Sequence, residues 1–361
     1  MPPDAAHFMK RLSQVRSRLL TADLDCLLFW DMKNIRYLTG FTGSDGALLL
    51  ERERTVLLVD GRYTTQARAE AGQTEIIEYR DKVPGISEIL AAGKIKAAGF
   101  EAAAVSFETY RKLKETVSDI NLIPLPGDID LRAIKDEAEI ALIRQAAGIA
   151  SQTLAALQGD IKPGVKERDV ALELEYRIRQ NGAEGVAFPP IVASGSNAAL
   201  PHAHPGERRL SPGDAVVIDF GAIYEGYHSD ETCTFFLGYA SAKQRELYAI
   251  VKEAHDRALA SVMAGMACRE IDRIARMCIE EKGFGKFFSH GTGHGVGLDI
   301  HEPPRIAPPS QAILKAGMVV TIEPGIYIPG EWGIRIEDTI LVKRDGYEVL
   351  TKLPKDFTVL Y

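Results

Sequence analysis

The sequence predicts an α+β protein with two domains. Three observations support this fold class: four long helical segments, two pairs of strands that resemble antiparallel hairpins, and a first third in which helices and strands alternate. A length of 361 residues suits two domains at roughly 100 to 200 residues each. The segment PLPGDIDLRAI, residues 124–134, is rich in Pro, Gly and Asp. We place the boundary there, with domains at residues 1–128 and 129–361.

The predicted N-terminal domain begins with a helix and continues with strands. An apolar stripe at helical spacing predicts a helix over residues 5–20, formed by Phe8, Leu12, Val15 and Leu19. Strands are predicted at residues 26–30, 47–50 and 55–59, and a polar helix follows at 63–71. This alternation is typical of an α/β domain.

The predicted C-terminal domain combines four helices with two hairpins. The helices are expected at residues 136–157, 165–180, 241–265 and 269–282. Gly182 follows the second helix as a stop signal, and Ser241 with Gln244 forms a capping box that starts the third. The hairpins are expected to pair residues 215–223 with 227–237, and residues 318–328 with 333–342.

Composition and charge indicate which classes of partner the protein is not expected to bind. The chain is 46% hydrophobic and 26% charged, which is typical of a globular protein, and its net charge is −7. Because binding to nucleic acid or to an anionic membrane needs concentrated Lys and Arg, we expect neither partner. Four cysteines without a CxxC motif predict reduced thiols. With no signal-peptide pattern and no expected membrane span, we predict a cytoplasmic location.

Each predicted hairpin carries two acidic residues within apolar strands. In the first, Asp219 and Asp230 lie on either side of a turn at residues 224–226, and a two-residue turn places them directly or diagonally opposite on one face. In the second, Glu323 and Glu337 alternate with apolar neighbours. Facing carboxylates in an apolar ladder need a cation or a shared proton. The alternative for either hairpin is the solvated outer face of an edge strand.

Seven of the eight histidines fall between residues 202 and 301. The segment SHGTGHGVGLDIHEPP holds His290, His294 and His301 among glycines, so these rings lie on turning or extended backbone that a ligand can approach. On a straight strand, His294 and His301 would point to opposite faces because they are seven residues apart, and we expect different roles for them. For any single histidine, an ordinary core or surface position is the alternative.

Four carboxylates and one imidazole are an expected ligand set for a dinuclear metal site. Four negative charges balance two divalent cations, so a bridging hydroxide is held with little net charge. We expect two divalent metal ions, Mn²⁺ before Co²⁺, Fe²⁺ or Zn²⁺, because oxygen ligands dominate. Two-metal hydrolases use such a pair to activate water and to stabilise the oxyanion of the intermediate.

The sequence resembles the pita-bread metallopeptidase family, which includes methionine aminopeptidase, aminopeptidase P and prolidase. The family pattern has Asp in DFG, Asp in SDxT, His in GHGxG, Glu in TIEPG and Glu in RIEDT. The chain supplies these residues in that order as Asp219, Asp230, His294, Glu323 and Glu337. The stretches NIRYLTGFTGSDGALLL, DGRY and IKDEAEIALIRQAA look like the aminopeptidase P and prolidase branch. The resemblance implies a creatinase-like N-terminal α/β domain followed by a pita-bread catalytic domain.

The resemblance also implies how the five ligands are used. Asp219 would chelate one metal ion, Asp230 and Glu337 would bridge both ions, and His294 with Glu323 would complete the other site. Glu323 would also be catalytic, because it would move the proton of the nucleophilic water.

Further residues receive roles from the same resemblance. His202 in NAALPHAHPG and His301 in DIHEPP would be catalytic, because they would contact the reacting amide and stabilise the intermediate. His290 would lie beside the substrate pocket. Like His290, Arg335 is assigned to substrate binding. Because it lies two residues before Glu337, it would also support the bridging carboxylates. Cys233 stands where Arg is common in the family, a departure expected to affect local support or substrate affinity.

The branch implies hydrolysis of the bond between an N-terminal residue and a proline in second position, in peptides or in dipeptides. This bond is a tertiary amide with no N–H, so it needs a dedicated pocket. Phe188 either forms an apolar wall for the proline ring or packs in the core. Dipeptidase and aminopeptidase activities share the inner ligands, so both stay open. A homodimer is also expected from the family.

Two other functions remain as alternatives on the same fold. A non-catalytic peptide-binding protein would typically have lost metal ligands, whereas all five are present here. A metal-independent C–N hydrolase in the manner of creatinase would not need this set of acids. Metal analysis separates both alternatives from the peptidase.

Overall fold

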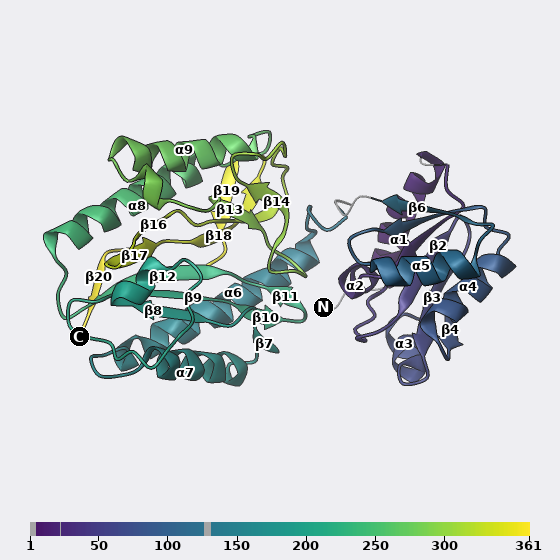
Figure 1. Cartoon of the computed structure of the whole chain (residues 1–361), viewed down its shortest axis with the longest axis horizontal. Coiled ribbons are helices and arrows are strands. Elements are labelled where there is room, and N and C mark those ends of the chain that lie inside the picture. The colour runs from purple at the N-terminus through teal and green to yellow at the C-terminus, as the bar shows by residue number, and fades with distance from the viewer. Residues whose placement is uncertain (1–4, 22, 126–130) are drawn as a thin grey trace. The chain divides into compact units, whose positions relative to one another are not determined.

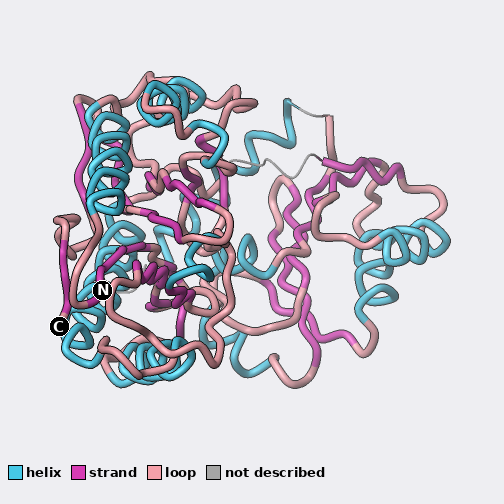
Figure 2. Tube along the Cα trace, turned by 60° about the vertical axis from the view of Figure 1, so that its left-hand side comes forward, coloured by secondary structure: helices cyan, strands magenta, loops and turns pink. Residues whose placement is uncertain are grey.

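The computed structural model describes residues 5–21, 23–125 and 131–361. The chain divides into two compact units, Met1–Arg132 and Ala133–Tyr361. Both units combine helices with strands (Figures 1 and 2), which confirms the predicted α+β class. The predicted domain boundary between residues 128 and 129 falls within residues 126–130, which lie outside the described residues.

The first unit contains a six-stranded sheet in the order β4-β3-β2-β1-β5-β6. Strand β2 is antiparallel to β1 and β3, and the other neighbours are parallel. The central strands are buried along their length, as expected for a sheet covered by helices on both faces. The elements are α1 (Ala5–Thr21), β1 (Cys26–Phe29), α2 (Met32–Thr39), β2 (Ala47–Glu51), β3 (Thr55–Asp60), α3 (Thr64–Glu70), β4 (Glu75–Tyr79), α4 (Lys82–Ala92), β5 (Ala97–Glu101), α5 (Phe107–Thr116) and β6 (Asn121–Leu125).

The predicted elements of this unit are found within a few residues of their expected bounds. The stripe that predicts the first helix is buried in α1, at Phe8, Leu12, Val15 and Leu19. Helix α2 begins at the N-cap Asp31 and ends at Gly40, which has a positive φ of 81°. Helices α4 and α5 pack against one face of the sheet through a shared hydrophobic cluster that includes Leu49, Leu90 and Leu113.

The second unit contains four sheets and four long helices. The sheets are β11-β10-β7, β20-β12-β9-β8, β14-β13-β15-β18-β19 and β16-β17. The helices are α6 (Glu137–Leu157), α7 (Glu167–Gln180), α8 (Ala242–Ala260) and α9 (Cys268–Glu281), with short 3-10 turns η1 (Gln158–Asp160), η2 (Gly195–Ala199) and η3 (Gly285–Phe287). The strands are β7 (Gly185–Val186), β8 (Ile191–Ser194), β9 (Ala215–Phe220), β10 (Ala222–Tyr224), β11 (Tyr227–His228), β12 (Glu231–Leu237), β13 (Gly293–Gly295), β14 (Glu302–Ile306), β15 (Val319–Ile322), β16 (Gly325–Ile328), β17 (Trp332–Arg335), β18 (Asp338–Lys343), β19 (Gly346–Val349) and β20 (Thr358–Leu360).

The two pairs of helices pack against different strands of the second unit (Figure 1). Helices α6 and α7 share a hydrophobic cluster with β8, β9 and β12, which form the first hairpin region. Helices α8 and α9 share another cluster with β15, β16, β17 and β18, which form the second. Each hairpin therefore has a rigid helical support behind it.

The four helices match their predictions, with differences at the ends. Helix α8 has the predicted capping box of Ser241 and Gln244, but it ends at Ala260 instead of residue 265. Helix α7 begins at Glu167, two residues later than predicted. Gly182 follows α7 with a φ of 99°, as expected for a helix stop.

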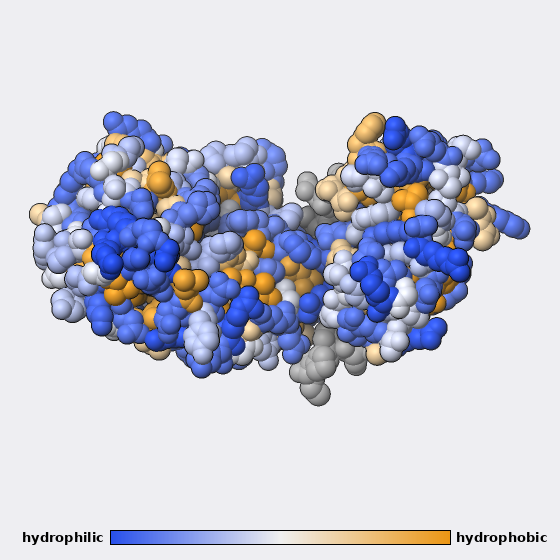
Figure 3. Space-filling view, turned by 60° about the horizontal axis from the view of Figure 1, so that its bottom comes forward, coloured by the Kyte–Doolittle hydropathy of each residue, from blue (hydrophilic) through white to orange (hydrophobic). Residues whose placement is uncertain are grey.

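Helix α6 passes a test of length and apolar composition for a membrane span, over Glu137–Asp160, although no span was expected from the sequence. Within its most apolar window, 56% is buried inside the protein, and a core helix of a soluble protein passes the same test. On the face shown in Figure 3, polar residues dominate and apolar residues form scattered patches.

Candidate metal centre

The first hairpin brings Asp219 and Asp230 to one face of the sheet. Strands β9 and β12 are antiparallel, and their register places Asp219 opposite Thr232. The hairpin continues through β10 and β11 to a two-residue turn at Glu225 and Gly226, both with positive φ, as such turns require. Asp230 therefore lies diagonally opposite Asp219, which is one of the two arrangements that the sequence left open.

The second hairpin consists of two separate ladders instead of the single continuous hairpin that was predicted. Strand β15 pairs with β18, and β16 pairs with β17 in the same register. The ladder is interrupted at Pro324, because proline has no N–H to donate. Since the register does not slip, Glu323 and Glu337 lie opposite each other between the two ladders.

Glycines let the histidine segment approach the second hairpin closely. His294 lies in β13 between Gly293 and Gly295. A Cβ atom added at Gly293 would lie 2.0 Å from the carbonyl oxygen of Thr321, so a larger residue would push β13 away. The close approach lets the His294 N–H donate to Thr321 Oγ1 at 3.1 Å.

His294 and His301 lie side by side, and the prediction that they point to opposite faces is wrong. Their ring centroids are 4.3 Å apart. The prediction assumed a straight strand, whereas the chain reverses direction between β13 and β14. Both rings are therefore available to one site.

Three of the expected ligands form a tight cluster. Asp230, His294 and Glu337 each offer one ligand atom, and these atoms lie within 4.8 Å of one another. His294 Nε2 lies 3.5 Å from Asp230 Oδ2 and 3.4 Å from Glu323 Oε1. The structure thus brings Glu323 to the edge of the cluster.

Burial makes the charged form of these acids unfavourable. Burial, followed by the charges of Glu337, Asp219 and Glu323, raises the pKa of Asp230. Burial also raises the pKa of Glu337, and it raises that of Glu323 to about 7. Burial lowers the pKa of His294 to about 4, so its ring is neutral at neutral pH. Without a nearby positive charge, these buried acids resist ionisation. A bound cation would supply that positive charge and favour their ionised form, and the neutral imidazole could bind it as well.

Asp219 provides a direct test of whether a cation fits this site. Its Oδ2 atom accepts a hydrogen bond from Arg335 Nη2 at 2.6 Å. Its Oδ1 atom is buried and has no partner among the described residues. A buried carboxylate oxygen without a partner is costly, and a divalent cation with oxygen ligands would satisfy it. The donor set therefore fits divalent metal ions.

Arg335 supports Asp219, and its guanidinium nitrogens bond to groups of the protein, whereas the sequence also assigned this residue to substrate binding. The residue is 3% exposed, and its Nη1 atom donates to Tyr327 Oη at 2.8 Å and to the carbonyl oxygen of Pro201 at 3.1 Å. Its Nε atom donates to Thr232 Oγ1, which in turn donates to Glu337 Oε2. These bonds use the guanidinium to fix carboxylates of the site, in agreement with the predicted supporting role.

Of the other predicted site residues, His301 lies beside His294, and Phe188 and His202 lie in the segments before and after β8. His301 is exposed as a residue, but partial burial of its ring lowers its pKa, against the opposing effect of the Asp219 charge. His202 is exposed as well. Phe188 is half-buried in the loop before β8, three residues from Ile191, which pairs with Asp219.

Both ring nitrogens of His290 already have partners. Its Nδ1 atom lies 2.7 Å from the carbonyl oxygen of Gly291, which can only accept, so Nδ1 carries the hydrogen. Burial lowers the pKa of this ring to about 4, so Nε2 accepts from Tyr327 Oη at 2.9 Å. The structure places His290 as a partner of Tyr327 next to the site.

Sequence reasoning gave no role to three residues of this network: Thr232, Thr321 and Tyr327. Thr232 follows Asp230 by two residues and Thr321 precedes Glu323 by two, so the period of a strand could have placed both on the same face as the acids. Tyr327 had no such signal, because its bonds to His290 and Arg335 depend on the fold.

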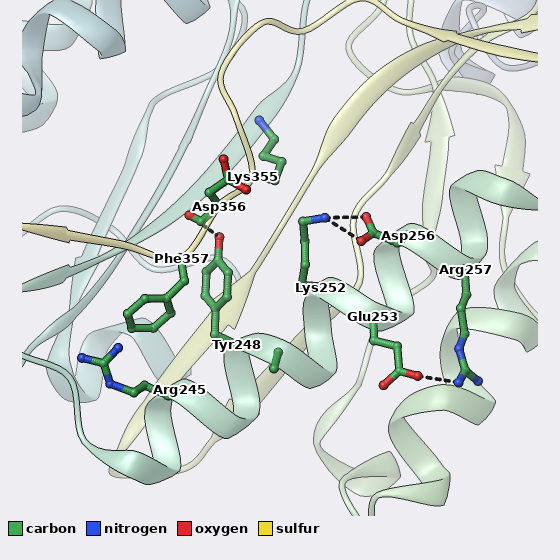
Figure 4. A pocket seen from close by; sticks show the side chains of 10 residues that line it. Arg245, Tyr248, Lys252, Glu253, Asp256, Arg257, Lys355, Asp356 and Phe357 are labelled. Atoms are coloured by element: carbon green, nitrogen blue, oxygen red, sulfur yellow. Dashed lines mark hydrogen bonds and ion pairs between the residues drawn. The ribbon is translucent and has the colours of Figure 1, made fainter.

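A separate surface hollow is lined by α8 and the C-terminal segment (Figure 4). Four of its charged side chains pair with one another: Lys252 with Asp256, and Arg257 with Glu253. None of the five expected ligands lines it. The hollow is therefore distinct from the acid cluster.

Two family models match the chain. The metallopeptidase family M24 matches residues 141–344, and the creatinase/prolidase N-terminal domain matches residues 11–134. The chain belongs to metallopeptidase family M24. This confirms the predicted metal-dependent peptidase and the creatinase-like domain in front of the pita-bread catalytic domain.

Solved structures and curated relatives of the M24 family extend the match over nearly the whole chain. An Xaa-Pro dipeptidase from Bacillus anthracis is 40% identical with a TM-score of 0.95, covering 98% of this chain and 100% of that chain. An X-Pro aminopeptidase from Thermotoga maritima is 37% identical with a TM-score of 0.89, covering 97% and 99%. An Xaa-Pro dipeptidase from Pyrococcus horikoshii is 39% identical, covering 92% of this chain and 94% of the relative.

Proposed function

We propose that this metallopeptidase hydrolyses the bond between an N-terminal residue and proline, with Xaa-Pro dipeptides as its first substrates. The observation that supports this most strongly is the convergence of Asp230, His294 and Glu337 beside the unpartnered oxygen of Asp219. Relatives that match nearly the whole chain are named Xaa-Pro dipeptidases, and one is named an aminopeptidase. Longer peptides with proline in second position are the second substrate class.

Five side chains would hold two divalent metal ions, Mn²⁺ before Co²⁺, Fe²⁺ or Zn²⁺: Asp219, Asp230, His294, Glu323 and Glu337. The bound ions would supply a hydroxide nucleophile at neutral pH and polarise the carbonyl of the scissile bond. The preference for Mn²⁺ rests on four carboxylates against one imidazole in this set.

Glu323 would move the proton during hydrolysis. Burial raises its pKa to about 7, so the carboxylate can accept a proton from water and return it to the leaving amine near neutral pH. Its Oε1 atom lies 3.4 Å from His294 Nε2, which keeps it at the edge of the cluster.

His202 and His301 would contact the reacting amide from the outer side. Both residues are exposed, and the ring centroid of His301 lies 4.3 Å from that of His294. A neutral imidazole N–H directed at the carbonyl oxygen would stabilise the charge that develops there. Phe188, half-buried near the strand that holds Asp219, would offer an apolar wall to the proline ring.

An assay of matched peptides tests this function. Metal-free protein is loaded with Mn²⁺ and given Ala-Pro, Ala-Pro-Gly-Gly and the control Ala-Ala. We expect metal-dependent release of proline from Ala-Pro and slow or no cleavage of Ala-Ala, because the pocket is specific for the ring. Faster cleavage of Ala-Pro-Gly-Gly would identify an aminopeptidase. Cleavage of neither proline peptide with Mn²⁺, Co²⁺, Fe²⁺ or Zn²⁺ would contradict the proposal.

We also propose a cytoplasmic homodimer that binds neither nucleic acid nor membranes. All four cysteines are free and buried, which suits a reducing compartment. The net charge of −7 disfavours polyanionic partners. The dimer follows from the family resemblance, and sedimentation velocity would test it by giving the mass of the particle in solution.

A further inference from the structure

One buried carboxylate joins both ends of the loop that carries His202. Glu167, the first residue of α7, is 0% exposed. Its Oε1 atom accepts from the N–H and the hydroxyl of Ser194, both at 2.7 Å. Its Oε2 atom accepts from Asn197 Nδ2 at 2.9 Å and from the N–H of Gly206 at 3.1 Å. The two oxygens thus close the segment of residues 195–206 into a tied loop.

The same carboxylate is connected to a second set of ionic contacts. The hydroxyl of Ser194 accepts from Arg208 Nη1, and Arg208 makes a two-point ion pair with Asp214 at 2.6 and 2.8 Å. A buried carboxylate that accepts four hydrogen bonds is a strong anchor, because bonds to a charged group are stronger than neutral ones. The bonds of Glu167 therefore hold the loop against a rigid base.

The tied loop also touches the support of a metal ligand. The carbonyl oxygen of Pro201 accepts from Arg335 Nη1 at 3.1 Å, and Arg335 Nη2 holds Asp219 at 2.6 Å. Close packing seats the loop against β17, where a Cβ atom added at Gly333 would lie 2.1 Å from the carbonyl oxygen of Ala198. A shift of the loop would thus move His202 and loosen the bond between Pro201 and Arg335.

We propose that Glu167 is a positioning residue for the hydrolysis. It holds the loop of residues 195–206 so that His202 reaches the reacting amide and Pro201 keeps Arg335 in place against Asp219. This inference rests on the proposed function, because His202 has a task only if the chain hydrolyses a peptide bond. Glu167 thereby becomes part of the site although it lies more than thirty positions before His202 in the sequence.

The substitution Glu167→Gln is a sharp test because it keeps the shape of the side chain. An amide offers one acceptor oxygen and one donor nitrogen, so it can satisfy either Ser194 or the Asn197 and Gly206 pair, but not both. Two backbone bonds remain, from the N–H of Glu167 to the carbonyl of Arg208 and from the N–H of Arg168 to that of Gly206. We therefore expect the loop to loosen while α7 and the fold persist.

The matched control is Asp169→Asn. Asp169 lies in the first turn of the same helix but is exposed, so this change removes the same charge from the same helix end without touching the loop. Asn197→Ala serves as a milder second variant, because it removes one donor and leaves the carboxylate. It keeps the test usable if Glu167→Gln does not fold.

The first measurement is a double-mutant cycle on the turnover of Ala-Pro. We expect Glu167→Gln to lower kcat by about tenfold to a hundredfold, with a smaller fall for Asn197→Ala and none for Asp169→Asn. Because part of the effect of Glu167 acts through His202, each loop variant should lower kcat by a smaller factor in a His202→Ala background than in the wild type. An equal fall in both backgrounds would overturn the proposal, because it would mean a general structural effect.

The second measurement does not depend on activity. Amide hydrogen exchange, read by mass spectrometry on the full chain, should rise in residues 195–206 in Glu167→Gln and stay unchanged in Asp169→Asn. Unchanged exchange in this segment of Glu167→Gln would overturn the role of Glu167. A wild-type protein without activity on proline peptides would instead contradict the proposed function, and the exchange result would then decide the anchoring claim by itself.

Discussion

At the scale of single residues, Asp219 Oδ1 is the one buried polar side-chain atom of the five expected ligands that has no hydrogen-bond partner among the described residues. Asp219 gives one oxygen to Arg335 and keeps the other buried without a partner among the described residues. Thr232 accepts from Arg335 and donates to Glu337, so the support around two expected ligands is continuous. The hydrogen bonds around the ligands thus fix their direction and leave their remaining oxygens for metal ions.

Replacing Arg335 should weaken metal binding more than it weakens the fold. In Arg335→Met, Asp219 loses its ionic partner and Tyr327 loses a donor, so the ligand is less well oriented. We expect a fall of about tenfold to a hundredfold in Mn²⁺ affinity, measured by calorimetry on metal-free protein. The control is Arg344→Met, at an exposed position of the same sheet region. Equal Mn²⁺ affinity for the two variants would contradict the supporting role of Arg335.

At the scale of elements, each hairpin strand uses its two faces for different charges. Asp230 and Glu337 face the cluster, whereas their neighbours Glu231 and Asp338 face a buried lysine on the other side. Lys355 Nζ lies 2.5 Å from Glu231 Oε1 and 3.4 Å from Asp338 Oδ1, and these side chains are nearly inaccessible. Because side chains alternate along a strand, Glu231 and Asp338 point away from the cluster, and Lys355 of the C-terminal segment neutralises their charge there.

Removing that lysine should strongly destabilise the protein. Lys355→Met leaves Glu231 buried without its ionic partner, and breaking a buried ion pair costs about 3 to 5 kcal/mol. We expect a loss of this size in the free energy of unfolding, measured by urea denaturation, with a control at the exposed Lys352→Met. The account of the hairpins would be wrong if both variants unfolded at the same urea concentration.

The contact between α8 and β18 should make stability depend on pH. Burial alone would lower the pKa of His255, but Asp256 and Asp338, each 3.2 Å from a ring nitrogen, raise it above 6.5. A raised pKa in the folded state means that this stabilisation is complete below the unfolded pKa of 6.5 and is lost as pH rises through the folded pKa.

The variant His255→Gln isolates this contribution. We expect the difference in unfolding free energy between wild type and variant to shrink as pH rises from about 6 to about 8, measured by denaturant titration at each pH. A difference that stays constant, or grows with pH, would show that the charged form of His255 does not contribute.

At the scale of the whole molecule, the sequence was most informative where a local pattern matched the fold. One capping box and the apolar stripes located the helices, and acids within apolar strands indicated the ligands Asp219, Asp230, Glu323 and Glu337. The resemblance added His294 and the order of the motifs. These signals are local, because the period of a helix or strand is visible within a few residues.

The rest depended on contacts between distant segments, which no local pattern records. The split of the second hairpin followed from one proline, and the reversal between His294 and His301 followed from how β13 pairs with β14. The bonds of Arg335 to Tyr327 and Pro201 were not predicted, because these partners belong to other segments of the chain. Glu167 was not found from the sequence, since its four donors lie far from it along the chain.

The most direct test of the central claim is the metal content of the protein. Metal-free protein is loaded with Mn²⁺ or Co²⁺, freed of excess ion and subjected to elemental analysis. We expect about two ions per chain for the wild type, and a lower content without turnover for Asp230→Asn, with an unchanged circular dichroism spectrum. Wild-type protein that retains no stoichiometric metal, or an Asp230→Asn variant that keeps both ions and full activity, would contradict it.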